Sequence, residues 1–189
     1  MFRTAQNDEH LSGKERALLL RLNNVYTKDM VLDILVPLIE QSSSVSLRAL
    51  DWTVVNWSKQ HNIVCSSSSP GEMTNIHHSY RTALTYWKRR LFDPFRRRRR
   101  IIVSVDGREW ETTLGQSNFV LFTFETGILS YVIGHIDMIE EDMNCVSKRK
   151  KRDRFDAQRS GVTRKRTELT TARKSMCFAY SAPMRVSFD

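Results

Sequence analysis

The sequence predicts a mostly helical α+β protein. It has a helical body over residues 1–145 with one β-hairpin at about 101–112, and a basic, largely disordered C-terminal tail over 146–189. Apolar residues recur at helical spacing through most of the body, and an Asp-Gly pair separates two β-prone runs. From Val146 onward the composition becomes basic and poor in apolar residues. A chain of 189 residues has room for one domain and an appendage.

The first helical pattern extends from Ser12 to Ile39. Polar Asn23 and Asn24, with a potential N-cap at Thr27, divide it into two predicted helices. Residues 1–10 are polar, and we expect them to be loose.

Two more helical patterns flank a serine-rich stretch. Residues 46–57 place four apolar side chains on one face, and residues 73–92 form an amphipathic pattern with a basic end. Between them, residues 65–72 hold four consecutive serines and a proline, which predicts a surface loop. Asp93 precedes Pro94 and is therefore pushed toward extended geometry, so the second helix ends there.

The hairpin is the strongest local signal, because Asp106-Gly107 between β-prone runs is typical of a two-residue type I′ turn. An isolated hairpin is marginal, so it must pack on helices or pair with a further strand. A wing beside a recognition helix is one interpretation, but we favour a packing role. The next predicted helix, 114–126, contains no Lys or Arg and cannot read a major groove in the usual way.

Two helices are predicted after the hairpin. Thr113 and Gln116 fit a capping box at the start of the first, which stops near Gly127. The second is expected to run from Ile128 to Met143 and to end in the acids of 137–142, which the helix dipole disfavours at that end. Its inward-facing residues are expected to be Leu129, Val132, Ile133, Ile136 and Ile139.

Basic charge is concentrated in two parts of the chain, whose formal net charge is +9. Residues 146–189 hold 13 Lys and Arg against 4 Asp and Glu, so residues 1–145 are neutral, with 17 of each sign. Residues 81–100 hold 9 basic side chains and one acid, Asp93. Such segments attract polyanions, either phosphate backbones or anionic lipid headgroups.

The first candidate site is the basic segment 88–100, where Trp87, Phe92 and Phe95 are expected to hold the cations rigidly. Arg binds phosphate through paired hydrogen bonds and stacks on bases. The arginines could instead form a solvated rim or pair with the acids at 137–142. A second basic run in the tail could also be a nuclear-import signal. The candidate nucleic-acid-binding residues are Lys88, Arg89, Arg90, Arg96, Arg97, Arg98, Arg99, Arg100, Lys148, Arg149, Lys150, Lys151 and Arg152.

A short stretch of the tail is a candidate partner site. Residues 171–175, TARKS, are identical to five residues in the tail of the third core histone, where aromatic cages bind the methylated lysine. Arg173, Lys174 and Ser175 would then contact a chromatin reader, although such short motifs also match by chance. The apolar end at 176–189 is expected to dock on the body or on a partner.

The sequence favours no catalytic, cofactor or metal site, so we expect a protein that is not an enzyme. It has no P-loop, dinucleotide-binding or G-x-S-x-G motif. Its three cysteines lack zinc spacing and suggest reduced thiols. Asp51 and Asn56 are expected to be capping or core hydrogen-bond partners. The absence of a long apolar run predicts no transmembrane segment, and the N-terminus lacks the apolar core of a signal peptide, which predicts synthesis in the cytosol.

The chain resembles a protein family of nucleocytoplasmic large DNA viruses, of chlorella virus and giant virus type, in four stretches. These are SLRALDWTVVNWSKQHNIV at 46–64, LFDPFRRRRRI at 91–101, TTLGQSNFVLFTFETGILSYVIGHIDMIEEDMN at 112–144 and MRVSFD at 184–189. The family's pattern continues after TT-x-GQ with Leu-Asn-Phe and an aromatic pair ending in Trp. This chain has SNFVLFT at 117–123 instead, so no role for that Trp carries over. The resemblance implies a viral protein made in the infected cell and no mechanism.

Two functions fit these observations best, and a nuclease-like enzyme with metal-dependent cleavage is a third hypothesis that no spacing of acids in the sequence supports. The first is a non-enzymatic viral protein that binds DNA or RNA phosphate backbones with little sequence preference, in packaging, nucleoid organisation or late gene expression. The alternative is a virion structural or interaction protein whose tail tethers it to a viral partner. Both place the protein in the infected host cell, in the nucleus or a cytoplasmic viral factory, with the virion as a further location.

Overall fold

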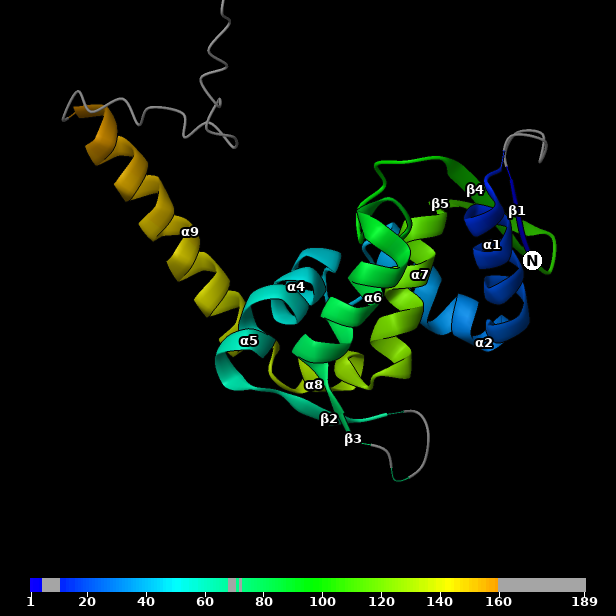
Figure 1. Ribbon diagram of the computed structural model, residues 1–189, viewed down its shortest axis with the longest axis horizontal. Coiled ribbons are helices and arrows are strands. Elements are labelled where there is room, and N and C mark those ends of the chain that lie inside the picture. The colour runs from blue at the N-terminus through cyan, green and yellow to red at the C-terminus, as the bar shows by residue number, and fades with distance from the viewer. Residues whose placement is uncertain (5–10, 68–70, 72, 160–189) are drawn as a thin grey trace, which may run out of the picture. The chain divides into compact units, whose positions relative to one another are not determined.

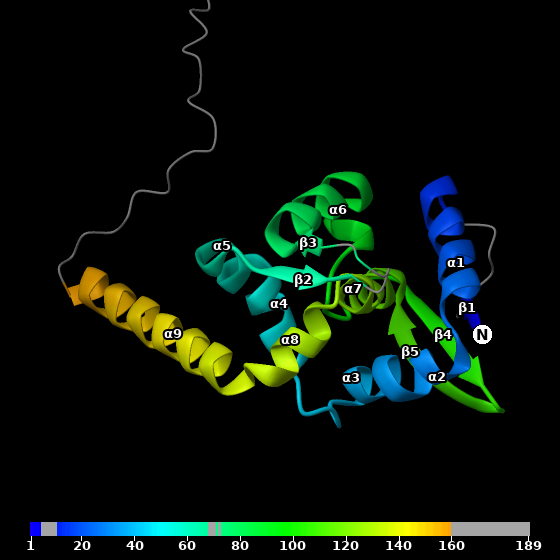
Figure 2. The same ribbon diagram turned by 90° about the horizontal axis from the view of Figure 1, so that it is seen from below.

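The computed structural model describes residues 1–4, 11–67, 71 and 73–159, with the backbone alone for residue 154 and residues 156–159. The predicted class is confirmed, since the body is mostly helical with small antiparallel sheets (Figures 1 and 2). The chain divides into two units, Met1–Ser147 and Lys148–Asp189. This division lies two residues beyond the predicted boundary between body and tail.

The first helical pattern forms two helical segments, as predicted. Helix α1 covers Gly13–Val25, and a second segment runs through α2 (Lys28–Met30), a π-helical stretch η2 (Val31–Leu35) and α3 (Val36–Glu40). The Thr27 hydroxyl accepts a hydrogen bond from the Met30 amide at 3.2 Å, which confirms it as the N-cap.

Residues 1–10 were expected to be loose, and for residues 2–4 this was wrong. Phe2–Thr4 form strand β1, which pairs with the hairpin strand β4 (Arg100–Val105). Asn23 holds the strand from α1: its Oδ1 accepts from the Phe2 amide at 2.8 Å, and its Nδ2 donates to the Phe2 carbonyl at 3.1 Å. The buried Phe2 ring lies 5.1 Å from Tyr26, so packing of one apolar side chain accompanies the pairing.

The middle of the body contains a second small sheet that the sequence did not predict. Helices α4 (Leu47–Trp52) and α5 (Ser58–His61) are joined by the π-helical stretch η3 (Thr53–Trp57). Strand β2 (Val64–Ser66) then pairs antiparallel with β3 (Met73–Asn75). Part of the predicted loop at 65–72 is therefore strand, and helix α6 (Ile76–Leu91) begins after Met73, where the helical pattern had been expected to start.

The hairpin forms as predicted and joins a three-stranded sheet in the order β1-β4-β5, where β5 covers Arg108–Thr113. Asp106 and Gly107 have φ values of 50° and 79°, both positive as a type I′ turn requires. On the inner face Ile101, Val103 and Val105 are buried. This burial agrees with a packing role for the hairpin rather than with a free wing.

Helix α7 (Leu114–Glu125) lies at the centre of the body, and every residue from Leu114 to Thr123 is buried. It contacts α1, α6, η2, strand β5 and helix α8 (Ile128–Gly134), and Figure 2 shows it between α6 and the sheet. The Thr113 hydroxyl caps it through the Gln116 amide at 3.1 Å. A helix enclosed in this way cannot enter a groove of DNA, as the lack of Lys and Arg had indicated.

The predicted helix 128–143 is in fact two helices. His135 (φ −130°, ψ 19°) ends α8, and α9 extends from Ile136 to Arg159. Asp137 therefore lies in the first turn of a helix, where the dipole favours it, and the other acids of 137–142 lie beyond that turn and not at a helix end. Ile133, two residues before the break, is 54% exposed, so its predicted inward position was wrong. Residues 146–159, expected to be disordered, are helical.

Candidate nucleic-acid interface

The basic segment 88–100 begins where α6 leaves helical geometry. Lys88 has φ 61° and ψ 161°, which interrupts the helix after Trp87. Residues 92–99, called the crossing below, then connect α6 with β4 over the surface of the body (Figure 1). Pro94 cannot continue the helix, and this segment makes few backbone hydrogen bonds of its own. Its free carbonyl groups therefore need other donors, which side chains of α7 supply.

Two buried polar side chains of α7 anchor this crossing. Asn118 Nδ2 donates to the Leu91 carbonyl at 2.8 Å, and Gln116 Nε2 donates to the Pro94 carbonyl at 3.1 Å. Gln116 Oε1 also accepts from Thr112, so its side chain does not return to the N-cap amide as a full capping box requires. The predicted box is therefore only half formed, because the amide of Gln116 serves the crossing instead.

Close packing reinforces these hydrogen bonds. The Asp93 amide donates to the Gly115 carbonyl at 3.3 Å, and a Cβ at Gly115 would lie 3.3 Å from the Asp93 nitrogen. The Phe92 ring lies in edge-to-face contact with Phe119 and Phe122 at 5.5 and 5.3 Å. The crossing is thus fixed to the core, while the arginines that follow point outward.

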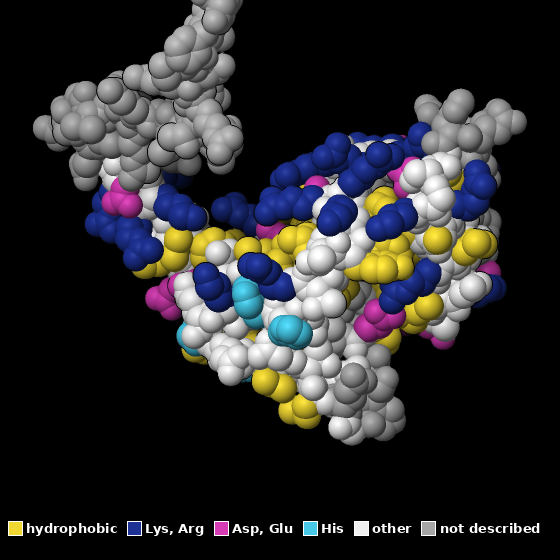
Figure 3. All heavy atoms as spheres, in the orientation of Figure 1, with side chains coloured by type: hydrophobic (Ala, Val, Ile, Leu, Met, Phe, Trp, Pro, Cys, Tyr) yellow, Lys and Arg dark blue, Asp and Glu magenta, His cyan; other side chains and the backbone are white. Residues whose placement is uncertain are grey.

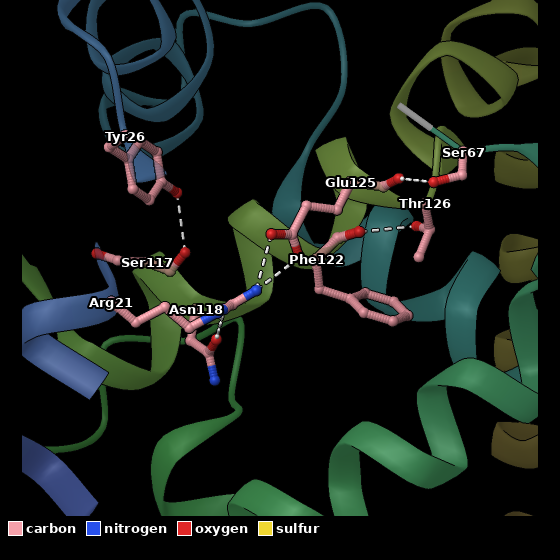
Figure 4. Close-up of polar contacts among 8 residues, drawn as sticks. All are labelled: Arg21, Tyr26, Ser67, Ser117, Asn118, Phe122, Glu125 and Thr126. Atoms are coloured by element: carbon pink, nitrogen blue, oxygen red, sulfur yellow. Dashed lines mark hydrogen bonds and ion pairs between the residues drawn. The ribbon is translucent and has the colours of Figure 1, made fainter. Parts of the chain in front are cut away.

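A polar cluster on the other side of α7 holds helix α1 against it (Figure 4). The Arg21 guanidinium donates to both carboxylate oxygens of Glu125, at 2.7 and 2.8 Å, and to Asn118 Oδ1 at 3.2 Å. Tyr26 OH donates to the Ser117 carbonyl at 2.8 Å, and burial raises the pKa of this phenol. Asn118 therefore connects the α1–α7 contact with the anchor of the basic segment.

Four of the eight cations in the segment make ion pairs. Arg90 pairs with Glu15 at 2.8 Å, Arg96 and Arg100 share Glu111 at 2.8 and 3.5 Å, and Arg97 lies 4.0 Å from Asp93. The alternative partners expected from the sequence were the acids at 137–142, whereas the pairs found use Glu15, Asp93 and Glu111. Even so, the side chains of the four paired arginines stay 40–67% exposed, so each can still reach a ligand.

The other four cations, Lys88, Arg89, Arg98 and Arg99, make no ion pair with any residue that the structure describes. Eight cations against Glu15, Asp51, Asp93 and Glu111 leave a local charge of +4. Lys and Arg side chains form a band along the upper edge of the body, over the crossing between α6 and β4 (Figure 3). This surplus forms an electropositive surface.

The acids at 137–142 do not neutralise this surface by any ion pair found among the described residues. Asp142 instead accepts a hydrogen bond from Trp52 Nε1 at 2.8 Å, and the others begin α9. In the second unit, Lys148–Arg152 are exposed residues of α9. Arg173, Lys174 and Ser175, together with the apolar end at 176–189, lie outside the described residues.

Two hollows adjoin the basic segment. The first has a volume of about 210 Å³ and is lined by Glu15, the unpaired Arg98 and Arg99, and the start of α7. Burial raises the pKa of Glu15, but hydrogen bonds from Ser12 and the Arg90 guanidinium lower it by more. The pKa of this carboxyl therefore lies below its ordinary value of 4.5. The carboxylate is therefore ionised at neutral pH and keeps Arg90 in place.

The second hollow, of about 260 Å³, brings together residues from α4, α6 and the crossing. It contains the carboxyl groups of Asp51 and Asp93, the cations Arg89 and Arg97, and the rings of Tyr80 and Phe95. Burial raises the pKa of Asp51, and Asp93 raises it further, while Arg97 and Arg89 act in the opposite direction. Burial likewise raises the pKa of Tyr80.

Sequence reasoning missed the roles of Gln116, Asn118 and Asp51. Asp51 and Asn56 were expected to be capping or core hydrogen-bond partners, but neither makes a side-chain hydrogen bond with another described residue. A polar pair within an apolar helix, as at Gln116 and Asn118, is the one signal that could have indicated the anchors. The described residues contain no group of three His, Cys, Asp or Glu placed to hold a metal ion. None of the described helices is long and apolar enough to span a membrane.

Comparison with known proteins gives a family. The model of a family described as "Family of unknown function (DUF7197)" matches residues 3–182. Among curated proteins, the chain is similar to uncharacterized protein L507 of Acanthamoeba polyphaga mimivirus, with 28% identity over 170 residues. The match covers 85% of this chain and 65% of that relative. No solved structure matches the chain. The giant-virus part of the resemblance seen in the sequence is thereby confirmed.

Proposed function

The chain belongs to the DUF7197 family. From the properties of its basic segment, we propose that it is a non-enzymatic viral protein that binds the phosphate backbones of nucleic acids. The observation that carries this proposal is the surplus of four positive charges that the cations of residues 88–100 keep over the four neighbouring acids, on an anchored crossing. Phosphate contacts position a protein on DNA or RNA and carry no sequence information, so little sequence preference is expected.

The unpaired cations would make the first phosphate contacts. Arg98 and Arg99 line the hollow of about 210 Å³, which has room for a phosphate group. Exposed ion pairs contribute only about 0–1 kcal/mol, so a phosphate can join or displace the pairs that Arg96 and Arg100 make with Glu111. We propose that Lys148–Arg152 add contacts from the second unit.

The test is a fluorescence anisotropy titration of the full chain against labelled duplex DNA and single-stranded RNA. Arg98→Gln together with Arg99→Gln removes two cations that no described acid holds, so affinity should fall and the log–log salt slope should become shallower by about 1.4–1.8. Lys59→Gln with Arg108→Gln is the matched control, because both are exposed cations outside the segment. Equal losses in the two double variants would reject the segment as the interface.

The alternative function is that of a virion structural or interaction protein. Exposed apolar side chains on α9, Met138 at 58% and Phe155 at 59%, favour a protein partner for this helix. A chain ending at residue 175 removes the apolar end at 176–189 and would impair assembly with virion proteins only under this alternative. The same truncation would leave nucleic-acid binding by residues 88–100 intact.

We propose that the protein acts in the infected cell, in the nucleus or in a cytoplasmic viral factory, and that packaging, nucleoid organisation or late gene expression is its context. A chromatin reader of Arg173, Lys174 and Ser175 and a place in the virion stay predictions of the tail sequence. That chlorella viruses contain proteins of the same family likewise stays a prediction.

A further inference from the structure

The hollow of about 260 Å³ differs from the other hollow beside the basic segment because aromatic rings line it together with two carboxyl groups and two guanidinium groups. Its volume is slightly below the roughly 300–1,000 Å³ of pockets for drug-sized ligands. A single heterocyclic base is of suitable size. The Arg97 guanidinium lies over the Phe95 ring, 4.8 Å from its centre, and both side chains line the hollow. Bases stack on aromatic rings and on guanidinium planes.

The two carboxylates of the hollow are not equivalent. Asp93 is occupied, since its Oδ1 accepts from the Phe95 amide at 3.0 Å and its Oδ2 faces Arg97. Asp51 is half-buried on α4 and accepts no hydrogen bond from any described residue. Buried polar groups are nearly always hydrogen-bonded, so a half-buried carboxylate of this kind offers two acceptor oxygens to a ligand.

The acceptor chemistry discriminates between bases. A carboxylate accepts two parallel N–H bonds best from a group that presents two adjacent donors. The Watson–Crick edge of guanine offers N1–H and the N2 amino group side by side. Adenine and cytosine place a ring acceptor beside their single amino group, and thymine or uracil places carbonyls on both sides of one N–H. In each of these bases a lone pair would face one oxygen of the carboxylate and repel it.

We propose that this hollow binds an unpaired guanine of a single-stranded nucleic acid, with Asp51 accepting from N1 and N2 and the Phe95–Arg97 pair stacking on the base. The inference rests on the proposed binding of phosphate backbones and adds its substrate class. In a duplex the Watson–Crick edge is already paired, so only a single strand, loop or end can supply it. Arg89 also lines the hollow and would contact a phosphate that flanks the bound base.

The experiment uses the full chain and labelled oligothymidylates of about 12 nucleotides, a length typical of single-strand sites. One carries a single central guanine, one carries hypoxanthine at that place, and one is all thymine. Wild-type protein should bind the guanine strand about tenfold more tightly than the all-thymine strand, as expected for a bidentate contact to a base. Hypoxanthine lacks the N2 amino group, so most of that preference should disappear.

Asp51→Asn is the protein variant, because an amide offers one acceptor and one donor. It should reduce the guanine preference to below about twofold. Asp33→Asn removes one exposed carboxylate elsewhere and should retain the preference. Since the hypoxanthine comparison uses wild-type protein, the proposal stays testable even if the Asp51 variant fails to fold.

The outcomes separate the two proposals. If wild-type protein binds all three strands equally and with steep salt dependence, the guanine site is rejected while phosphate binding stands. If it binds none of them, and no duplex, the proposed function fails as well. A guanine preference that survives Asp51→Asn would also overturn the assignment, because the selectivity would then come from another part of the surface.

Discussion

Replacement of Gln116 by Met tests whether the buried amide holds the basic segment on the core. Methionine has a similar length but cannot donate to the Pro94 carbonyl or accept from Thr112. Thr112 keeps a second partner, since its hydroxyl lies 3.4 Å from Ser117 Oγ. The main loss is therefore one buried carbonyl without a donor.

An unsatisfied buried acceptor costs roughly 1–3 kcal/mol, so we expect the free energy of unfolding to fall by about 2 kcal/mol. For a domain of this size that corresponds to a decrease in Tm of about 4–8 °C. Urea unfolding followed by tryptophan fluorescence measures the free energy, because Trp57 and Trp87 are part of the core or packed against it. The affinity for nucleic acid should also decrease, since the crossing that carries the arginines loses its anchor.

The control is Gln60→Met, which makes the same chemical change at an exposed position of α5. It should leave the unfolding midpoint within about 0.5 kcal/mol of wild type. A Gln116 variant as stable as the Gln60 variant would refute the claim that this amide stabilises the crossing.

Two further predictions concern the body. Gly127→Ala should destabilise by more than about 2 kcal/mol in urea unfolding, because φ is +72° there and the added Cβ would overlap the carbonyl oxygen of Ser66; Gly13→Ala, whose Cβ meets nothing, should be nearly neutral. Arg90→Gln should lower the free energy of unfolding at neutral pH, because Glu15 loses its ion-pair partner. The difference in free energy between this variant and wild type should shrink as the pH falls below 4.5 and Glu15 becomes protonated at its lowered pKa. A stability difference that is constant from pH 7 to pH 3 would show that the ion pair is not the cause.

The sequence predicted the parts of the fold that depend on local chemistry. Asp106-Gly107 gave the hairpin turn because few other pairs adopt two positive φ values, and Thr27 and Thr113 gave helix starts because a hydroxyl satisfies a free amide. Each of these signals involves residues that lie within four positions of one another in the sequence. They need no knowledge of what the element contacts.

The missed parts depend on contacts between distant positions. Strand β1 exists because Phe2 meets Val103 across 101 positions of the chain, and nothing in the first ten residues indicates that partner. The hollow around Asp51 likewise needs α4, α6 and the crossing together. The helix break at His135 was also missed, because the apolar pattern of 128–143 continues across it.

If the surface of residues 88–100 binds phosphates, the affinity of the full chain for duplex DNA must depend strongly on salt concentration. With five or more phosphates neutralised, the plot of log affinity against log salt concentration should have a slope of about −4 or steeper. A slope near zero, or no binding at low salt, would contradict the account.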